Sequence, residues 1–154
     1  MICSRKRLWL CAGLIALCLC FIWGNSLMPG EVSAAFSDWV GEILEALLDM
    51  PPKPSQGRGL LRKLAHFTEF AALGMLLTWL MGMRQKPIWL AQLFGSLAAC
   101  VDETIQCFVP GRGPGLRDVC IDSSGVFTGM IVIFLGYSLL IRGRKPHNFG
   151  GNKT

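Results

Sequence analysis

An uncharged apolar segment near the start of the chain constrains the fold most strongly. The segment runs from Leu8 to Met28 and contains no acidic or basic residue. About 20 such residues can cross the hydrocarbon core of a bilayer as a helix. A cleaved signal peptide also begins with basic residues before an apolar core. Because the weak cleavage-like triplet at 33–35 lies well past that core, we expect an uncleaved transmembrane helix.

Three more apolar segments follow, and the composition fits them, with 52% hydrophobic and only 16% charged residues. We therefore predict an all-α, polytopic membrane bundle that forms one domain over residues 1–145. Its four transmembrane helices are expected at about 8–28, 64–83, 88–109 and 119–141. The polar, glycine-containing tail at 146–154 is expected to be disordered and cytoplasmic.

The segment at about 31–50 has a different pattern. Apolar residues recur there at helical spacing, whereas the acidic residues occupy the opposite face. This segment is too polar to span a bilayer, and a proline-rich loop follows it. We predict an amphipathic helix on the outer face, which either lies in the membrane interface or packs as a cap on the bundle.

Charge asymmetry predicts the orientation of the bundle. If the N-terminus is cytoplasmic and four helices cross, the basic residues at 5–7, 84–86 and 142–145 are all cytoplasmic, and the acidic residues fall in the outer half. Both termini are then cytoplasmic. The net charge of +5 reflects this topology. Because the basic residues form no basic face and no nucleic-acid-binding motif, we predict the lipid bilayer, and no nucleic acid, as a partner.

A charged stretch from Asp102 to Asp122 joins the last two apolar segments. In the predicted topology, three segments deliver polar residues to one outer level, and we call these residues the polar cluster. It consists of Lys63, His66, Glu69, Asp102, Glu103, Gln106, Arg112, Asp118 and Asp122. A charge at the centre of a bilayer helix costs about 2.5–3.5 kcal/mol on insertion scales, so such residues usually have partners and a function.

The polar cluster contains more acids than bases. The excess must be protonated, solvated, or balanced by a bound cation or cationic ligand. An ion-pair network that only fixes helix register is the alternative to a binding site. We favour the binding site because ionisable residues inside membranes are functional by default.

Spacing adds detail to this prediction. Asp118, Asp122, Gly125 and Gly129 fall on one helical stripe, and the two glycines form a G-x-x-x-G pair that allows close helix packing. The two aspartates should therefore face another helix. Arg112, in a Pro-Gly turn, either binds a phosphate or carboxylate or pairs with Asp118.

The sequence allows more than one chemical role for the polar cluster. His66 and Glu69 are three residues apart, as for a general base and the carboxylate that orients it, or for a simple hydrogen-bonded pair. With Asp102, they are the catalytic candidates. His66, Glu69, Asp102 and Asp122 include metal-ligand types, but they lack a recognised spacing and have cationic neighbours, so we predict no metal and no cofactor.

Seven cysteines are present, without a C-x-x-C pair. Cys107 and Cys120 flank the charged turn. A disulfide between them is one alternative, but we expect two unpaired, buried thiols.

Three stretches resemble the VanZ-like family of bacterial membrane proteins. They are NSLMPGEVSAAFS (25–37), RKLAHFTEFAALG (62–74) and DETIQCFVPGRGPGLRDVCIDSSGVFTG (102–129), in this order along the chain. The family usually has Asn or Asp at position 122, and Tyr is commoner than the Phe found here at position 70. The resemblance points to the same nine residues as the polar cluster.

The resemblance implies a small multi-pass protein of the bacterial cytoplasmic membrane. The family's founding member is linked to low-level resistance to teicoplanin, and no agreed enzymatic activity comes with the family. We expect the cluster to bind a polar or cationic group of a lipid head group, cell-wall precursor or lipoglycopeptide. The alternatives are an enzyme that acts on a lipid-linked substrate with His66 as general base, and a structural partner of another membrane protein.

Overall fold

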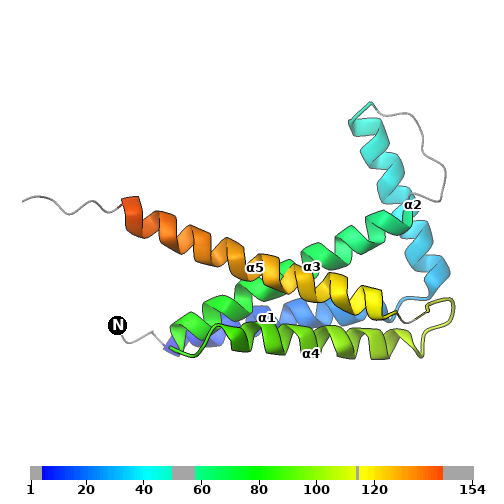
Figure 1. The fold of residues 1–154 in the computed structure, drawn as a ribbon. Helices are drawn as coiled ribbons and strands as arrows, with labels where there is room; N and C mark the ends of the chain where they lie inside the picture. Colours follow the sequence, from blue (N-terminus) through cyan, green and yellow to red (C-terminus); the bar gives the residue numbers. More distant parts are fainter. Residues whose placement is uncertain (1–4, 50–57, 114, 144–154) are drawn as a thin grey trace, which may run out of the picture.

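The computed structural model describes residues 5–49, 58–113 and 115–143, and its regular elements are all helices. They are α1 (Arg5–Ser26), α2 (Gly30–Leu47), α3 (Arg58–Met83), α4 (Trp89–Gln106) and α5 (Leu116–Gly143). Helices α1, α3, α4 and α5 form an elongated bundle, and α2 projects from one end of it (Figure 1). Helices α1 and α4 run in one direction and α3 and α5 in the other, so the ends of the first pair meet the starts of the second pair.

Three of the described helices are long and apolar enough to cross a membrane, namely Arg5–Ser26, Gly59–Met83 and Leu116–Leu140. The fold class is thus confirmed as all-helical, but the prediction of four transmembrane helices needs correction at α4. The apolar segment at 88–109 forms a helix of 18 residues whose last turns contain Asp102, Glu103 and Gln106. These side chains reduce its hydropathy, and the chain leaves the helix before Val109.

Small residues bring α3 and α5 into close contact in the core. A Cβ atom added to Gly125 would collide with the carbonyl oxygen of Phe67, and one added to Gly129 would collide with that of Ala71. From the other side, Gly74 of α3 lies against the backbone of Val126. Such contacts place two helix backbones closer than larger residues allow.

The outer surface of the bundle is apolar. Large side chains such as Trp9, Leu17, Phe134 and Leu140 are more than half exposed on α1 and α5. Contiguous exposed apolar surface is rare on soluble monomers, and a membrane helix presents such side chains to lipid.

Helix α2 begins against the loop between α4 and α5. The backbone N–H of Gly30 donates a hydrogen bond to the Pro110 carbonyl oxygen at 3.0 Å. A Cβ atom at Gly30 would collide with the backbone of Gly111, which has a φ of 74°. Apolar side chains on α2, including Phe36 and Trp39, are exposed, as expected for an amphipathic helix.

Cys107 and Cys120 are both free, as predicted, but both are exposed rather than buried. The expectation of buried thiols was wrong because Cys107 follows the end of α4 and Cys120 lies on an exposed side of α5. The predicted disordered tail at 146–154 lies outside the described residues.

Candidate functional site

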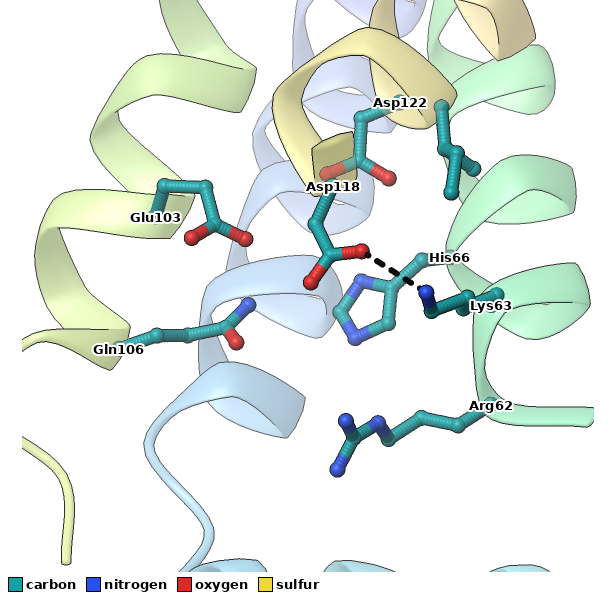
Figure 2. Close-up of a pocket in the computed structure, with 8 residues that line it drawn as sticks. Arg62, Lys63, His66, Glu103, Gln106, Asp118 and Asp122 are labelled. Carbon is teal, nitrogen blue, oxygen red and sulfur yellow. Dashed lines mark ion pairs between the residues drawn. The ribbon is translucent and has the colours of Figure 1, made fainter. Parts of the chain in front are cut away.

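The polar cluster lies at the end of the bundle where α3 and α5 begin and α1 and α4 end. Figure 2 shows Arg62, Lys63 and His66 of α3 facing residues of α4 and α5 across a small cavity. The cavity has a volume of ≈ 20 Å³, which is enough for a water molecule or an ion. The antiparallel arrangement of the helices therefore gathers residues that are far apart in sequence.

Three side chains from three helices form the centre of the cluster. His66, Asp102 and Asp122 each offer an oxygen or nitrogen atom, and these atoms lie within 4.8 Å of one another. Asp102 and Asp122 are almost completely buried, with 0% and 2% exposure. We call these residues the His–Asp–Asp triad.

Asp102 is held by its neighbour on the same helix. Gln106 Nε2 donates to Asp102 Oδ2 at 2.7 Å and lies 3.3 Å from Ser26 Oγ, a fully buried hydroxyl of α1. His66 Nδ1 is 3.9 Å from the same Oδ2 atom. The other oxygen, Asp102 Oδ1, is buried without a hydrogen-bond partner among the described residues.

Glu69 lies beside the triad, one helical turn from His66. Its Oε2 atom is 3.9 Å from His66 Nδ1. Its Oε1 atom accepts a hydrogen bond from Asn25 Nδ2 at 2.9 Å. Asn25 and Ser26 were missed as site residues by the sequence reasoning, although a polar pair at the end of an apolar segment was an available signal.

The remaining acidic residues have partners at the edge of the cavity. Lys63 Nζ is 3.6 Å from Asp118 Oδ1, and both side chains are partly exposed. Glu103 Oε2 accepts a hydrogen bond from the backbone N–H of Gly115 at 2.9 Å. The lysine thus pairs at the rim rather than with the buried aspartates.

Arg112 interacts with the end of α1. Its Nε donates to the Met28 carbonyl oxygen at 3.1 Å and its Nη2 to the Asn25 carbonyl oxygen at 2.8 Å. A cation at a helix C-terminus satisfies free carbonyl groups and interacts favourably with the helix dipole. Burial, followed by repulsion from Arg62, lowers the pKa of the Arg112 guanidinium. The predicted alternative of an Arg112–Asp118 pair is wrong, because Lys63 pairs with Asp118.

All nine predicted residues thus lie at one end of the bundle, but in different roles. Six of them line the cavity, namely Lys63, His66, Glu103, Gln106, Asp118 and Asp122. Asp102 and Glu69 contact His66 from neighbouring positions, and Arg112 ties the α4–α5 loop to α1. Arg62, which also lines the cavity, was not among the predicted site residues.

A second, larger cavity lies between α1, α2 and α3, and we call it the apolar groove. Its volume is ≈ 460 Å³, and its apolar lining includes Phe21, Phe36 and Leu64. At one end it is lined by polar residues of α1, α3 and the α4–α5 loop, namely Asn25, Arg62, His66, Glu69 and Arg112. Arg62 and His66 line both the groove and the small polar cavity.

Apolar helices that surround a buried polar cluster define a helical membrane protein with a polar site between its helices. The family model VanZ/LLP1 matches residues 11–140, and the chain belongs to this family. The matched region contains the whole polar cluster, so the resemblance noted in the sequence is confirmed. Neither a curated protein nor a solved structure matches the chain.

Proposed function

We propose that this VanZ-family protein binds an amphipathic molecule of the cell envelope. The molecule's polar group lies at the polar end of the apolar groove, beside Arg62 and His66, and its apolar chain occupies the rest of the groove between α1, α2 and α3. The observation that carries this proposal is that Arg62 and His66 line both cavities. One ligand can therefore contact the polar cluster and the apolar groove at the same time.

The groove suits a hydrocarbon chain in size and lining. Its volume of ≈ 460 Å³ falls within the range of about 300–1,000 Å³ that is usual for ligand sites. Burial of the chain contributes little selectivity, however, because the surrounding lipid tails are just as apolar as the groove. Recognition must therefore depend on the polar group.

The polar end offers several kinds of contact to that group. Arg62 and Arg112 supply guanidinium groups that suit phosphate or carboxylate, and Glu69 suits a cationic group. A lipid head group, a lipid-linked cell-wall precursor and a lipoglycopeptide all combine such polar groups with an apolar chain. If the basic N-terminus is cytoplasmic, α1 carries this end of the bundle to the outer face, where these molecules are found.

Binding of a lipoglycopeptide would link the protein to teicoplanin resistance, and teicoplanin susceptibility in a bacterial host tests this link. Cells with empty vector, wild type, His66→Ala and Asp122→Ala are compared at equal, quantified levels of protein in the membrane. Wild type is expected to lower susceptibility, whereas the two variants are not. Glu42→Gln is the matched control, because it removes an exposed acid on α2 away from the cluster. Equal protection by wild type and His66→Ala would exclude a role of the cluster in resistance.

An enzyme is the second candidate, and the position of His66 favours it. His66 Nδ1 lies 3.9 Å from a carboxylate oxygen of both Glu69 and Asp102, so an approach of about 1 Å would let either carboxylate accept a hydrogen bond from the imidazole and orient it as a general base. Purified protein is incubated with a lipid-linked cell-wall precursor, and products are followed by mass spectrometry. His66→Gln should reduce turnover by about 10²–10⁴-fold with folding intact. Unchanged turnover in this variant would exclude the mechanism.

A further inference from the structure

We infer that His66, Asp102 and Asp122 form a binding site for one divalent metal ion of the manganese or zinc class. The geometry of the triad is close to that of a coordination site. Its ligand atoms lie within 4.8 Å of one another. Ligands about 2.1 Å from a common ion lie about 3.0–3.4 Å apart, so the side chains need to approach by roughly 1–2 Å at most.

The charges around the triad favour a cation. Two buried carboxylates face each other, and within residues 5–49, 58–113 and 115–143 neither Asp102 nor Asp122 forms an ion pair with a lysine or arginine. Lys63 pairs with Asp118, and Arg112 is bonded to carbonyl groups of α1. Burial of an uncompensated carboxylate costs several kcal/mol, and a divalent ion compensates both residues together.

Cationic neighbours were one of two sequence-based reasons to predict no metal, and the lack of a recognised ligand spacing was the other. In the structure Arg62 and Lys63 do line the cavity beside His66 and Asp122, but Lys63 pairs with Asp118. In Figure 2 the Arg62 guanidinium lies on the opposite side of His66 from Asp122. The Lys63 ammonium group is directed to Asp118 at the rim. Among the described residues, no lysine or arginine pairs with Asp102 or Asp122, so the charge of these two carboxylates is left for another cation.

An unsatisfied buried atom gives independent support for a bound ion. Asp102 is 0% exposed, and its Oδ1 atom has no hydrogen-bond partner among the described residues. A cation bound beside His66, whose Nδ1 lies 3.9 Å from Asp102 Oδ2, would compensate the buried carboxylate to which this unpaired oxygen belongs. Gln106 already holds the other oxygen at 2.7 Å, as residues in the second shell of metal sites do when they fix the orientation of a ligand.

The donor set indicates which ions the site would take. One imidazole nitrogen with two carboxylate oxygens suits manganese or zinc better than magnesium or calcium, which prefer oxygen ligands alone. The adjacent cavity of ≈ 20 Å³ leaves room for a water ligand on the open side of the ion. If the proposed function holds, the polar group of the envelope ligand replaces this water, and a phosphate or carboxylate fits best.

Metal binding by the wild-type protein in detergent is the primary test. The protein is stripped with a chelator and titrated with Mn²⁺, and free Mn²⁺ is followed by electron paramagnetic resonance, with Zn²⁺ as competitor. We expect one saturable site per chain that Zn²⁺ also occupies. The absence of saturable binding of both ions would overturn the inference without the need for any variant.

Matched variants then locate the ion. Asp102→Asn and Asp122→Asn preserve side-chain shape and should each weaken Mn²⁺ binding by about tenfold or more. Glu42→Gln is the same type of change on the exposed side of α2 and should bind as wild type does. Unchanged affinity in both aspartate variants would place the ion elsewhere and contradict the assignment.

Native mass spectrometry of the same preparation separates this inference from the proposed function. Binding of Mn²⁺ without any retained polar lipid would support the metal site and contradict the proposed function. A metal-free protein that retains lipid and binds no Mn²⁺ would contradict the metal site alone.

Discussion

The two halves of α5 have opposite environments although they belong to one continuous helix. In the first half, Asp122, Gly125 and Gly129 face the bundle, and the two glycines pack on the backbone of α3. In the second half, Phe134 and Leu140 are exposed by 62% and 73%. Figure 1 shows this second half diverging from α3. Hydropathy thus indicates that the helix can cross a membrane, and small and polar residues indicate where it contacts other helices.

The two halves of α5 also differ in what they can contribute to function. The exposed half of α5 presents apolar side chains, which make interchangeable contacts with lipid. The packed half buries polar atoms that need specific partners, and it lines the small polar cavity. The functional proposals therefore concern the packed half, and the following changes test whether the two halves differ as described.

The largest effect is expected for a bulky residue in the packed half. Gly129→Leu would force α3 and α5 apart, because a side chain there collides with the Ala71 carbonyl group. Overpacking of this kind costs about 1–3 kcal/mol or more. Gly136→Leu is the matched control, since no atom lies within 4 Å of a Cβ at that position. Thermal unfolding in detergent measures the stability of both variants. Equal stability of the two would contradict the described α3–α5 contact.

A smaller effect is expected for the arginine that ties the loop to α1. Arg112→Ala removes two hydrogen bonds, one exposed and one partly buried, so the free energy of unfolding should fall by about 1 kcal/mol. Hydrogen exchange at residues 25–31 should become faster. Arg84→Ala removes an exposed arginine at the other end of α3 and should change stability by less than about 0.5 kcal/mol. Unchanged exchange in Arg112→Ala would mean that these bonds do not hold the end of α1.

The smallest effect is expected for the ion pair at the rim. Lys63 and Asp118 lie 3.6 Å apart with side chains 42% and 31% exposed. Exposed pairs contribute about 0–1 kcal/mol. A double-mutant cycle with Lys63→Gln and Asp118→Asn should give a coupling energy in this range that falls at high salt. A coupling well above it would show that the pair belongs to the buried centre rather than to the rim.

Much of this arrangement could be predicted from the sequence because it depends on local patterns. The stripe of Asp122, Gly125 and Gly129 indicated that one side of α5 faces a helix, and α3 lies there. The antiparallel threading of apolar segments also predicted that the polar residues gather at one end. The prediction of a fourth transmembrane helix at 88–109 treated the polar last turns of α4 as part of an apolar segment.

Other features depend on tertiary contacts that leave no sequence signal. The triad joins His66, Asp102 and Asp122 from three helices, and their adjacency depends on helix rotation as well as on order along the chain. Arg112 binds backbone carbonyl groups, which every residue possesses, so its partners could not be read from side chains. The apolar groove likewise exists only where α2 packs beside α1 and α3.

Photo-crosslinking from the two regions tests the central claim most directly. Benzoylphenylalanine is placed at Phe36, in the apolar groove, or at Phe134, on the outer half of α5, two rings with nearly equal exposure of 61% and 62%. After irradiation in membranes, the adducts are identified by mass spectrometry. We predict one dominant adduct with a polar head group at position 36, which is lost in His66→Gln, and a mixture of bulk lipids at position 134, which the same substitution does not change. The same mixture at both positions, unaffected by His66→Gln, would contradict the proposed binding site.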